Sequence, residues 1–264
     1  MKNCIFSTII FLIASSASAN ICHRAGSHVY TELPENSISS LKAVVFGHQS
    51  RPAIELNKSC KYIEADVQET ADGQLVIFHD STLKRMLPNN EINQIAIKNI
   101  LSDTNVRRRM RRTKKTYNSL RIKHVTLAQL QTLVLKKSTN ERVPSLEQFL
   151  EVFAELGVKK PLALDIKTFY TNSARRKMIS LARSFRENVL SRINTIFVNS
   201  YDMSKTGISF IGNRKSVWNS LNVKFFSSGK WCKALHKNGF SRVYKVLKHR
   251  INLCKRGGVF ASLF

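Results

Sequence analysis

The sequence is poor in acidic residues and in cysteine. It has 17 Asp and Glu against 43 Lys and Arg, a formal net charge of +26. We therefore expect anionic partners such as lipid head groups, nucleic acid or polyanionic polymers. The cysteines form no Cys-x-x-Cys pair and no Cys/His set with zinc spacing, which argues against a structural zinc site. Neither a nucleic-acid reader motif nor an interleaved aromatic platform accompanies the charge, so no specific nucleic-acid partner is expected.

Long apolar runs and linkers are also missing. Beyond residue 19 no stretch approaches the 18 or so consecutive apolar residues of a membrane-spanning helix. The five prolines are scattered, there is no Pro- or Gly-rich linker, and no internal repeat is visible. We predict that residues 20–264 form one domain.

The first 19 residues have the pattern of a secretory signal peptide. Lys2 precedes an apolar run over residues 5–14, and small residues follow up to Ala19. Export to the periplasm or the exterior is therefore expected. Beyond the signal the count of cysteines is even, which allows one or two disulfides in an oxidising compartment and leaves their pairing open. They are Cys22, Cys60, Cys232 and Cys254.

The rest of the chain alternates strand-like and helix-like segments. Strands are expected at 20–25, 61–70, 73–80, 160–169 and 192–202, with helices at 35–47, 145–157 and 173–190. Asn36 or Ser37 could cap the first helix, and a turn at Asp72-Gly73 joins the second and third strands. This alternation predicts an α/β fold with parallel strands, and the length suits a (β/α)8 TIM barrel. A doubly wound open sheet is the alternative. The seventh and eighth strands would lie at 239–247 and 257–264.

A basic segment, residues 88–125, interrupts this alternation after the third expected strand. It contains "RRRMRRTKKT" and shows no apolar periodicity over that run. One interpretation is a solvated, flexible insertion; the other is an anion-binding arm at the mouth of the site. In the second case Arg107–Lys115 would contact an anionic membrane surface.

Acidic residues lie unusually within apolar strands. Strand side chains alternate faces, so Glu64 and Asp66 point the same way, as do Asp165 and Lys167. If the shared face is the barrel interior, three carboxylates converge there. Such a cluster is costly unless a cation neutralises it, and oxygen ligands suit Mg²⁺ or Ca²⁺.

Histidines end two of the expected strands. His23 and His79 stand where barrel enzymes place functional groups, and imidazole titrates near neutrality. One ring can therefore take a proton from a nucleophile while the other donates a proton to a leaving group. Arg24 and Lys167 are suited to binding phosphate oxygens.

Taken together, these residues resemble a known family. The ordered motifs are "HRAG" at 23–26, "PENS" at 34–37, "IEADV" at 63–67, "FHD" at 78–80, Arg85, "VPSLEQFL" at 143–150, "LDIK" at 164–167 and "NSYD" at 199–202. The chain is similar to the glycerophosphodiester phosphodiesterases of the phospholipase-C-like barrel superfamily. The similarity fades after residue 202, where the family's tryptophan-containing strand motif and closing aspartate motif are absent. The resemblance therefore implies a barrel whose last strands are atypical or degenerate.

The resemblance implies a metal-dependent hydrolysis of glycerophosphodiesters to sn-glycerol 3-phosphate and an alcohol. Its alternatives are a phospholipase-type phosphodiesterase acting on membrane (lyso)phospholipids and a non-catalytic anion- or membrane-binding barrel. In the family the third metal ligand is normally a glutamate, where this chain has an aspartate. The implied roles are general acid/base for His23 and His79, phosphate binding for Arg24 and Lys167, support for Glu35, and metal binding for Glu64, Asp66 and Asp165.

Overall fold

The computed structural model describes residues 21–181, except residues 59, 61, 161, 172, 175 and 179, and the backbone of five later strands. Its strands form two sheets. The first has the order β1-β2-β4-β5, with β3 paired to β2, and the second has the order β6-β7-β8-β9. The strands of the first sheet are β1 (Ile21–Cys22), β2 (Tyr62–Glu69), β3 (Leu75–Ile77), β4 (Leu162–Thr168) and β5 (Ile193–Val198).

Parallel strands make up most of the first sheet. β1, β2, β4 and β5 pair in parallel, and Asp66 on β2 lies directly opposite Asp165 on β4. Helix α1 (Ile38–Phe46) lies between β1 and β2 in the chain, and helix α5 (Leu146–Glu155) precedes β4. The mixed α/β character predicted from the sequence is therefore confirmed.

β3 differs from the expected barrel strand. It pairs antiparallel to β2, with Val67 opposite Ile77, as the second strand of a hairpin. The turn at Asp72 and Gly73 explains the direction, because so short a connection cannot carry a crossover between parallel strands. Gly73 has φ 74°, the left-handed conformation that a glycine adopts without strain. His79 thus follows a hairpin strand that folds back along β2.

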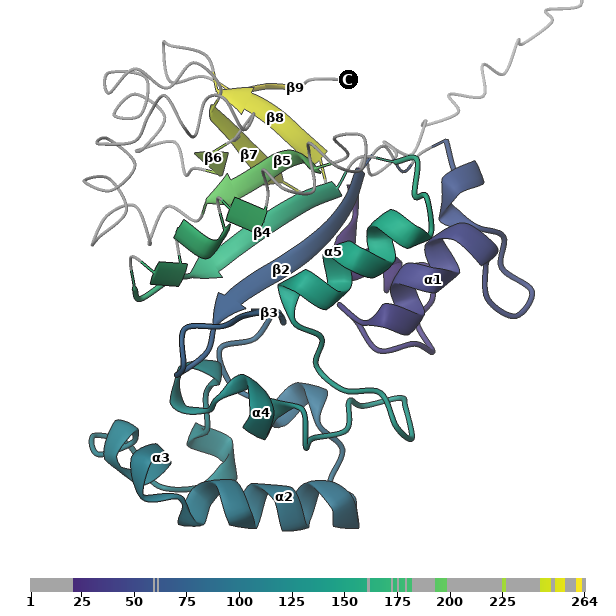
Figure 1. Ribbon diagram of the computed structural model, residues 1–264. Coiled ribbons are helices and arrows are strands. Elements are labelled where there is room, and N and C mark those ends of the chain that lie inside the picture. Colours follow the sequence, from purple (N-terminus) through teal and green to yellow (C-terminus); the bar gives the residue numbers. More distant parts are fainter. Residues whose placement is uncertain are drawn as a thin grey trace, which may run out of the picture.

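Helices α1 and α5 lie side by side along β2 and cover one face of the sheet (Figure 1). Ile63, Ala65 and Val67 of β2 are buried in the core beneath these helices, where they pack with residues such as Leu41 and Phe149. Strand alternation then leaves the even-numbered residues of β2 on the opposite face. Ser37 caps α1 through a capping box with Ser40, one of the two capping residues that the sequence indicated.

Residues 88–125 are folded around apolar side chains, which corrects the expectation of a segment without apolar periodicity. They include α2 (Glu91–Ser102) and α3 (Thr104–Arg109), and α4 (Leu127–Leu130) follows. Ile100, Val106 and Met110 are buried in a second apolar cluster with Phe78 and Leu130. Asp103 directly follows α2, where its backbone N–H donates to the Ile100 carbonyl, and its side chain caps α3 by accepting from the backbone N–H groups of Asn105 and Val106. The basic side chains of α3 therefore stand on a packed helix.

The second sheet differs from the end of a parallel barrel. Its strands are β6 (Phe225–Phe226), β7 (Val243–Leu247), β8 (Arg250–Cys254) and β9 (Phe260–Ser262). Strands do occur in both places expected for the last two barrel strands. However, β8 pairs antiparallel with β7, and β9 pairs antiparallel with β8. The expected eighth parallel strand is thus the last strand of an antiparallel meander.

A disulfide joins Cys22 to Cys60. This outcome confirms one of the bonds that the sequence allowed, whereas Cys232 and the predicted signal peptide lie outside the described residues. Part of the helix expected at 173–190 also lies outside them. Among the helices that the structure describes, none is long and apolar enough to span a membrane.

Candidate active site

Three carboxylates meet on the face of the first sheet that points away from α1 and α5. Glu64 and Asp66 are buried side chains of β2, and Asp165 is a half-buried side chain of β4. One oxygen from each of the three lies within 4.8 Å of the others. The alternation and register of the two strands thus produce the convergence expected from the sequence.

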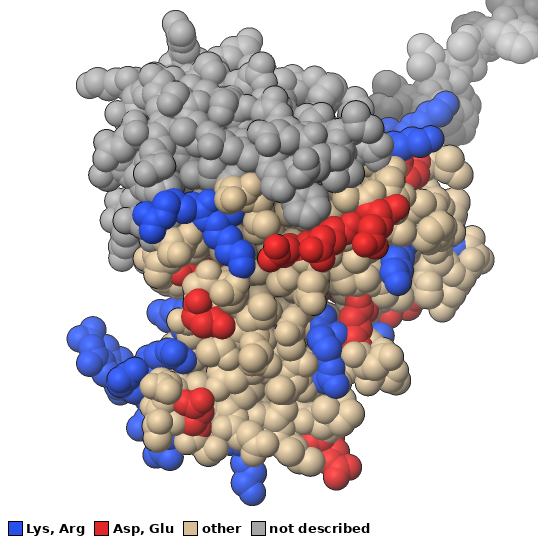
Figure 2. Space-filling model, in the orientation of Figure 1, with Lys and Arg blue, Asp and Glu red and all other residues tan. Residues whose placement is uncertain are grey.

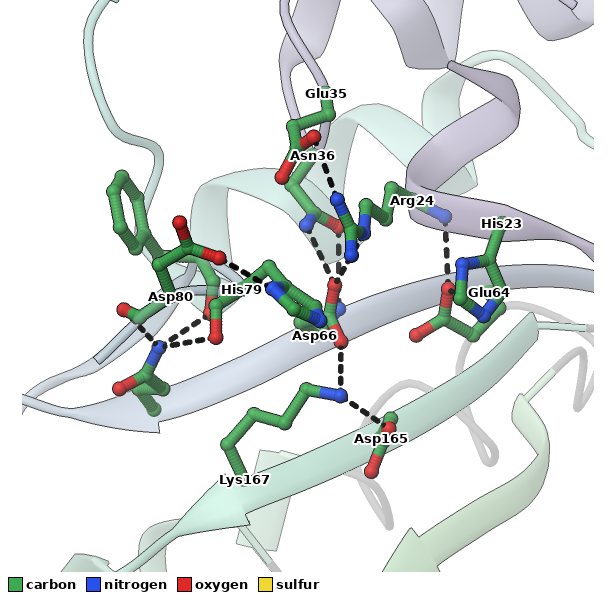
Figure 3. Close-up of polar contacts among 12 residues, drawn as sticks. His23, Arg24, Glu35, Asn36, Glu64, Asp66, His79, Asp80, Asp165 and Lys167 are labelled. Carbon is green, nitrogen blue, oxygen red and sulfur yellow. Dashed lines mark hydrogen bonds and ion pairs between the residues drawn. The ribbon is translucent and has the colours of Figure 1, made fainter. Parts of the chain in front are cut away.

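Lys167 is the cation closest to this cluster. Its ammonium lies 2.7 Å from Asp66 Oδ1 and 2.6 Å from Asp165 Oδ2, as Figure 3 shows. Burial lowers the pKa of Lys167, but Asp165 and Asp66 outweigh burial and raise it above its usual range. The lysine is therefore charged at neutral pH and compensates part of the negative charge.

Of the three acids, Glu64 has the least compensation of its negative charge by nearby cations. Burial, reinforced by the charges of Asp66 and Asp165, raises its pKa well above its usual range. Burial also raises the pKa of Asp66, but the charge of Lys167 outweighs it and leaves that pKa lowered. Glu64 Oε1 is buried without a hydrogen-bond partner in the described part of the chain. The cluster thus lacks positive charge on its Glu64 side.

The residues after β1 bring a cation and an imidazole to the same cluster. Arg24 donates its backbone N–H to Glu64 Oε2 at 2.8 Å and its Nη1 to Glu35 Oε2 at 2.8 Å. His23 Nε2 lies 3.9 Å from Glu64 Oε2. Gly26, with φ 87°, lies against Ile54, where a side chain would collide. This glycine allows the tight turn that places His23 and Arg24.

Asn36 fixes Asp66 from the opposite side. It donates Nδ2–H to Asp66 Oδ2 at 2.7 Å and accepts the Asp66 backbone N–H at 3.2 Å. Asn36 has φ 56°, a left-handed conformation that asparagine tolerates better than most residues. The sequence suggested a helix cap for this residue, but Ser37 has that role. Asn36 instead positions a buried acid.

Two polar side chains hold His79 in place. Gln68 on β2 donates to the backbone carbonyls of Phe78, His79 and Asp80 at 2.8–3.0 Å. His79 Nδ1 lies 2.6 Å from Asp80 Oδ1. Burial raises the pKa of Asp80, but hydrogen bonds from Arg85 and His79 outweigh it and lower the pKa to about 2. An ionised carboxylate only accepts, so Nδ1 of His79 carries the proton towards it.

Arg85 links the histidine to the other side of the site. It donates to Asp80 Oδ2 at 2.5 Å and to both oxygens of Glu35, at 2.8 and 2.5 Å. Because Arg24 also binds Glu35, a continuous chain of ion pairs runs from Arg24 through Glu35, Arg85 and Asp80 to His79. Two guanidinium groups therefore balance the two carboxylates of this chain.

All eight residues predicted for the site lie in or beside this arrangement. Figure 3 shows His23 beside Glu64 and His79 beside Asp66, so the two imidazoles lie on either side of the acids. The prediction of site residues missed Asn36, Gln68, Asp80 and Arg85. Arg85 and the motifs that contain Asn36 and Asp80 had been noted as parts of the resemblance, which was the available signal.

Comparison with known proteins identifies the family of the chain that carries this site. The family model for the glycerophosphoryl diester phosphodiesterase family matches residues 23–209. The chain belongs to this family, and the prediction of an enzyme of this class is confirmed. Membership implies a TIM-barrel-like fold and a glycerophosphodiester as the small-molecule substrate. No curated protein matches the chain.

Solved structures of the same class are similar to the chain at low identity. A glycerophosphodiester phosphodiesterase from Parabacteroides distasonis is 15% identical, with 84% of this chain and 90% of that chain covered and a TM-score of 0.42. A phosphodiesterase from Oleispira antarctica, in complex with the product sn-glycerol-3-phosphate, is 16% identical, with 84% and 90% covered and a TM-score of 0.41. A glycerophosphodiester phosphodiesterase from Agrobacterium tumefaciens is 16% identical, with 84% and 94% covered and a TM-score of 0.38.

Proposed function

We propose that this chain is an exported, divalent-metal-dependent enzyme that hydrolyses glycerophosphodiesters to sn-glycerol 3-phosphate and an alcohol. One observation carries the proposal. Three carboxylates, two imidazoles, a guanidinium and an ammonium group meet on a single face of the sheet. The family match gives the class of reaction, and this constellation assigns roles to residues.

The carboxylate cluster fits a hard divalent cation. Its donors are all oxygen atoms, and Glu64 Oε1 and Asp66 Oδ1 are buried without a hydrogen-bond partner in the described residues. The nearest cation, Lys167, forms ion pairs with Asp66 and Asp165. We assign Glu64, Asp66 and Asp165 as the ligands of Mg²⁺ or Ca²⁺. Although the family normally has a glutamate at the third position, Asp165 lies directly opposite Asp66, close enough to share an ion. When bound, the ion polarises the phosphodiester and stabilises negative charge on its oxygens.

Arg24 and Lys167 bind the phosphate in this proposal. Lys167 donates one hydrogen bond to Asp165 and forms an ion pair with Asp66, so its ammonium still has donor capacity for a phosphate oxygen. Arg24 is tied to Glu35 through one nitrogen, while its Nε has no hydrogen-bond partner among the described residues. Donors of both side chains therefore remain for an anion beside the acids.

The two histidines divide the proton transfers. Because Nδ1 of His79 donates to Asp80, the neutral ring presents Nε2 as a proton acceptor. His23 lies at the other end of the cluster, beside Glu64. One ring takes the proton of the attacking hydroxyl, and the other protonates the leaving alkoxide. Glu35 supports both halves, since it is bound to Arg24 and Arg85.

Export and a closed barrel complete the proposal. The pattern of residues 1–19 supports a signal peptide, and the Cys22–Cys60 disulfide is of the kind that persists in the periplasm or outside the cell. Residues 20–264 would form one barrel domain with 88–125 as an insertion. The parallel β1-β2-β4-β5 order supports the first part of that barrel.

The test is hydrolysis of glycerophosphocholine by purified residues 20–264, with and without Mg²⁺ or Ca²⁺. We expect metal-dependent release of sn-glycerol 3-phosphate and its loss in His23→Ala. His48→Ala is the matched control, since His48 lies outside the site and should leave the rate unchanged. A parallel assay with lysophosphatidylcholine distinguishes the phospholipase-type alternative. A folded, metal-supplied protein that turns over no diester would contradict the proposal.

A further inference from the structure

The outer surface of α2 exposes large aliphatic side chains. Ile92 is 48% exposed and Ile95 is 55% exposed, one helical turn apart. They border a groove of about 470 Å³ between α2 and α4. The groove is lined by Ile92, Ile95, Ala96, Asn99, Ile100, Gln129 and Thr132. The helix therefore buries one apolar face in the protein and presents a second one outward.

A dense group of positive charges lies on the next helix, α3, and on the residues that follow it. The basic residues from Arg107 to Lys115 are all exposed, and none of them forms an ion pair with another residue in the described part of the chain. A second groove of about 520 Å³ mixes both kinds of side chain, with Lys98 and Arg107 beside Ile97, Leu101 and Tyr117. Figure 2 shows Lys and Arg side chains projecting at the α3 end of the molecule, beside a largely uncharged surface.

The packing of the two helices fixes the direction of these charges. Val106 and Met110 are fully buried, so the rest of the α3 surface points outward. The Asp103 carboxylate caps α3 and accepts a hydrogen bond from Gln129 at 2.9 Å. The basic and aliphatic side chains therefore form a preorganised surface on packed helices.

This surface lies on the same side of the molecule as the site. The carboxyl ends of β2 and β4 point towards the part of the molecule that contains α2, α3 and α4 (Figure 1). Glu64, Asp66, Asp165 and Lys167 lie along these two strands. A large partner bound at α2 and α3 would therefore lie at the end of the molecule towards which the carboxyl ends of β2 and β4 point.

We propose that Ile92, Ile95, Lys98 and the basic side chains of residues 107–115, here named the α2–α3 surface, dock this protein on an anionic lipid membrane. Basic side chains contact lipid phosphates, and the two isoleucines enter the interface between head groups and acyl chains. Exposed aliphatic side chains favour a membrane over a nucleic acid, which offers them no apolar medium. The concentrated charge argues against pairing with a second copy. Docking goes beyond the proposed hydrolysis and does not require it.

The charge contribution is tested by sedimentation of residues 20–264 with vesicles of equal parts phosphatidylglycerol and phosphatidylcholine, at about 0.1 M salt. The variant replaces four exposed arginines by glutamine: Arg107, Arg108, Arg111 and Arg112. The matched control replaces four exposed lysines elsewhere by glutamine: Lys42, Lys58, Lys136 and Lys159. We expect binding roughly 100-fold or more weaker in the variant and a change within about threefold in the control. Equal weakening in both would show non-specific attraction and overturn the proposal.

The aliphatic contribution has its own pair of variants. Ile92→Ser with Ile95→Ser should bind the same vesicles about tenfold more weakly. Phe46→Ser with Leu56→Ser removes two side chains that are 73% and 77% exposed elsewhere and should bind like the wild type. Circular dichroism verifies that each variant is folded. Unchanged glycerophosphocholine hydrolysis separates docking from the site. Undiminished binding of the isoleucine variant, or a dimer that this variant abolishes, would overturn the proposal.

Discussion

The site contains two acidic clusters that differ in how their charge is balanced. Glu35 and Asp80 are bound by two guanidinium groups, those of Arg24 and Arg85. In contrast, Asp66 and Asp165 share the ammonium of Lys167 at distances below 3 Å, while Glu64 has no lysine or arginine side chain at ion-pair distance among the described residues. In each cluster, when His79 is counted with Glu35 and Asp80, one possible ligand atom from each residue lies within 4.8 Å of the others. The cluster of Glu64, Asp66 and Asp165 therefore needs an added cation, whereas the cluster of Glu35 and Asp80 orients His79.

The opposite pKa shifts follow from this difference. The pKa of Asp80 is lowered to about 2 by Arg85 and His79 despite partial burial, whereas burial and neighbouring acids raise that of Glu64. A carboxyl group whose pKa is lower in the folded than in the unfolded protein stabilises the fold at pH values above its unfolded-state pKa, and this stability is lost as the pH falls. A carboxyl group whose pKa is higher in the folded protein has the reverse effect, so the folded protein loses stability as the pH rises. The two clusters therefore respond to pH in opposite directions.

The largest effect is predicted for a variant that disrupts the cluster of Glu35 and Asp80, here called the balanced cluster because two guanidinium groups compensate it. Asp80→Asn should lower kcat by about 10²–10⁴-fold, because an amide favours the wrong tautomer of His79. The metal concentration that gives half-maximal activity should not change, since Asp80 is no ligand. Steady-state kinetics at several metal concentrations measure both quantities. A weaker apparent metal affinity with unchanged kcat would mean that the two clusters have exchanged roles.

The next prediction concerns a variant that lacks Glu64, the acid with the least compensation of its charge. With metal at 100 times its Kd, wild-type protein should gain about 2.7 kcal/mol of stability, a rise in Tm of roughly 5–10 °C. Glu64→Gln should abolish this rise and should increase Tm in the absence of metal, because a buried acid beside two others is replaced by a neutral amide. Thermal unfolding with and without EDTA tests both. Glu35→Gln is the matched control and should retain the metal-induced rise.

A smaller effect is expected from Asn36→Ala. The variant loses the hydrogen bonds to buried Asp66 and places alanine in a left-handed conformation, at a total cost of about 2 kcal/mol in the free energy of unfolding. Asn99→Ala on the exposed surface of α2 should change it by less than about 0.5 kcal/mol. Urea titration measures both values. Equal stabilities would show that Asn36 does not hold Asp66.

The smallest prediction concerns pH. Between pH 5 and pH 2, wild-type protein should lose about 1 kcal/mol of stability through protonation of partly exposed Asp80, after allowance for screening by solvent. Arg85→Gln should flatten this part of the pH profile because the Asp80 pKa returns towards 3.8. In metal-free protein, Glu64→Gln should instead flatten the loss above pH 4.5. Chemical unfolding from acidic to alkaline pH gives the profiles, and identical curves for all three proteins would contradict the account.

The cluster on the strands was predictable from the sequence, because two simple regularities determine it. Alternation places Glu64 with Asp66 and Asp165 with Lys167, and parallel pairing brings the two strands together. The balanced cluster was not predictable in the same way. Arg85 and Glu35 are 50 residues apart, and only the path of the intervening loops brings them into contact.

Two features of the fold escaped prediction for local reasons. In residues 88–125 the buried positions Ile100, Val106 and Met110 belong to two short helices separated by Asp103, so no long periodic pattern exists. For β3, the Asp72-Gly73 turn was recognised, but its antiparallel consequence conflicts with counting β3 as a parallel barrel strand. Local turn chemistry was therefore more informative than the expected family topology.

The most direct test of the account is the rate of glycerophosphocholine hydrolysis as a function of Mg²⁺ or Ca²⁺ concentration, for wild-type protein and Glu64→Gln. The account predicts that wild-type activity rises from near zero along a single saturation curve. Its midpoint should match that of the metal-induced rise in Tm. Glu64→Gln should show neither response at the same concentrations. Wild-type turnover that persists in EDTA, or a Glu64→Gln variant with an unchanged metal response, would contradict the assignment of this cluster as the metal site.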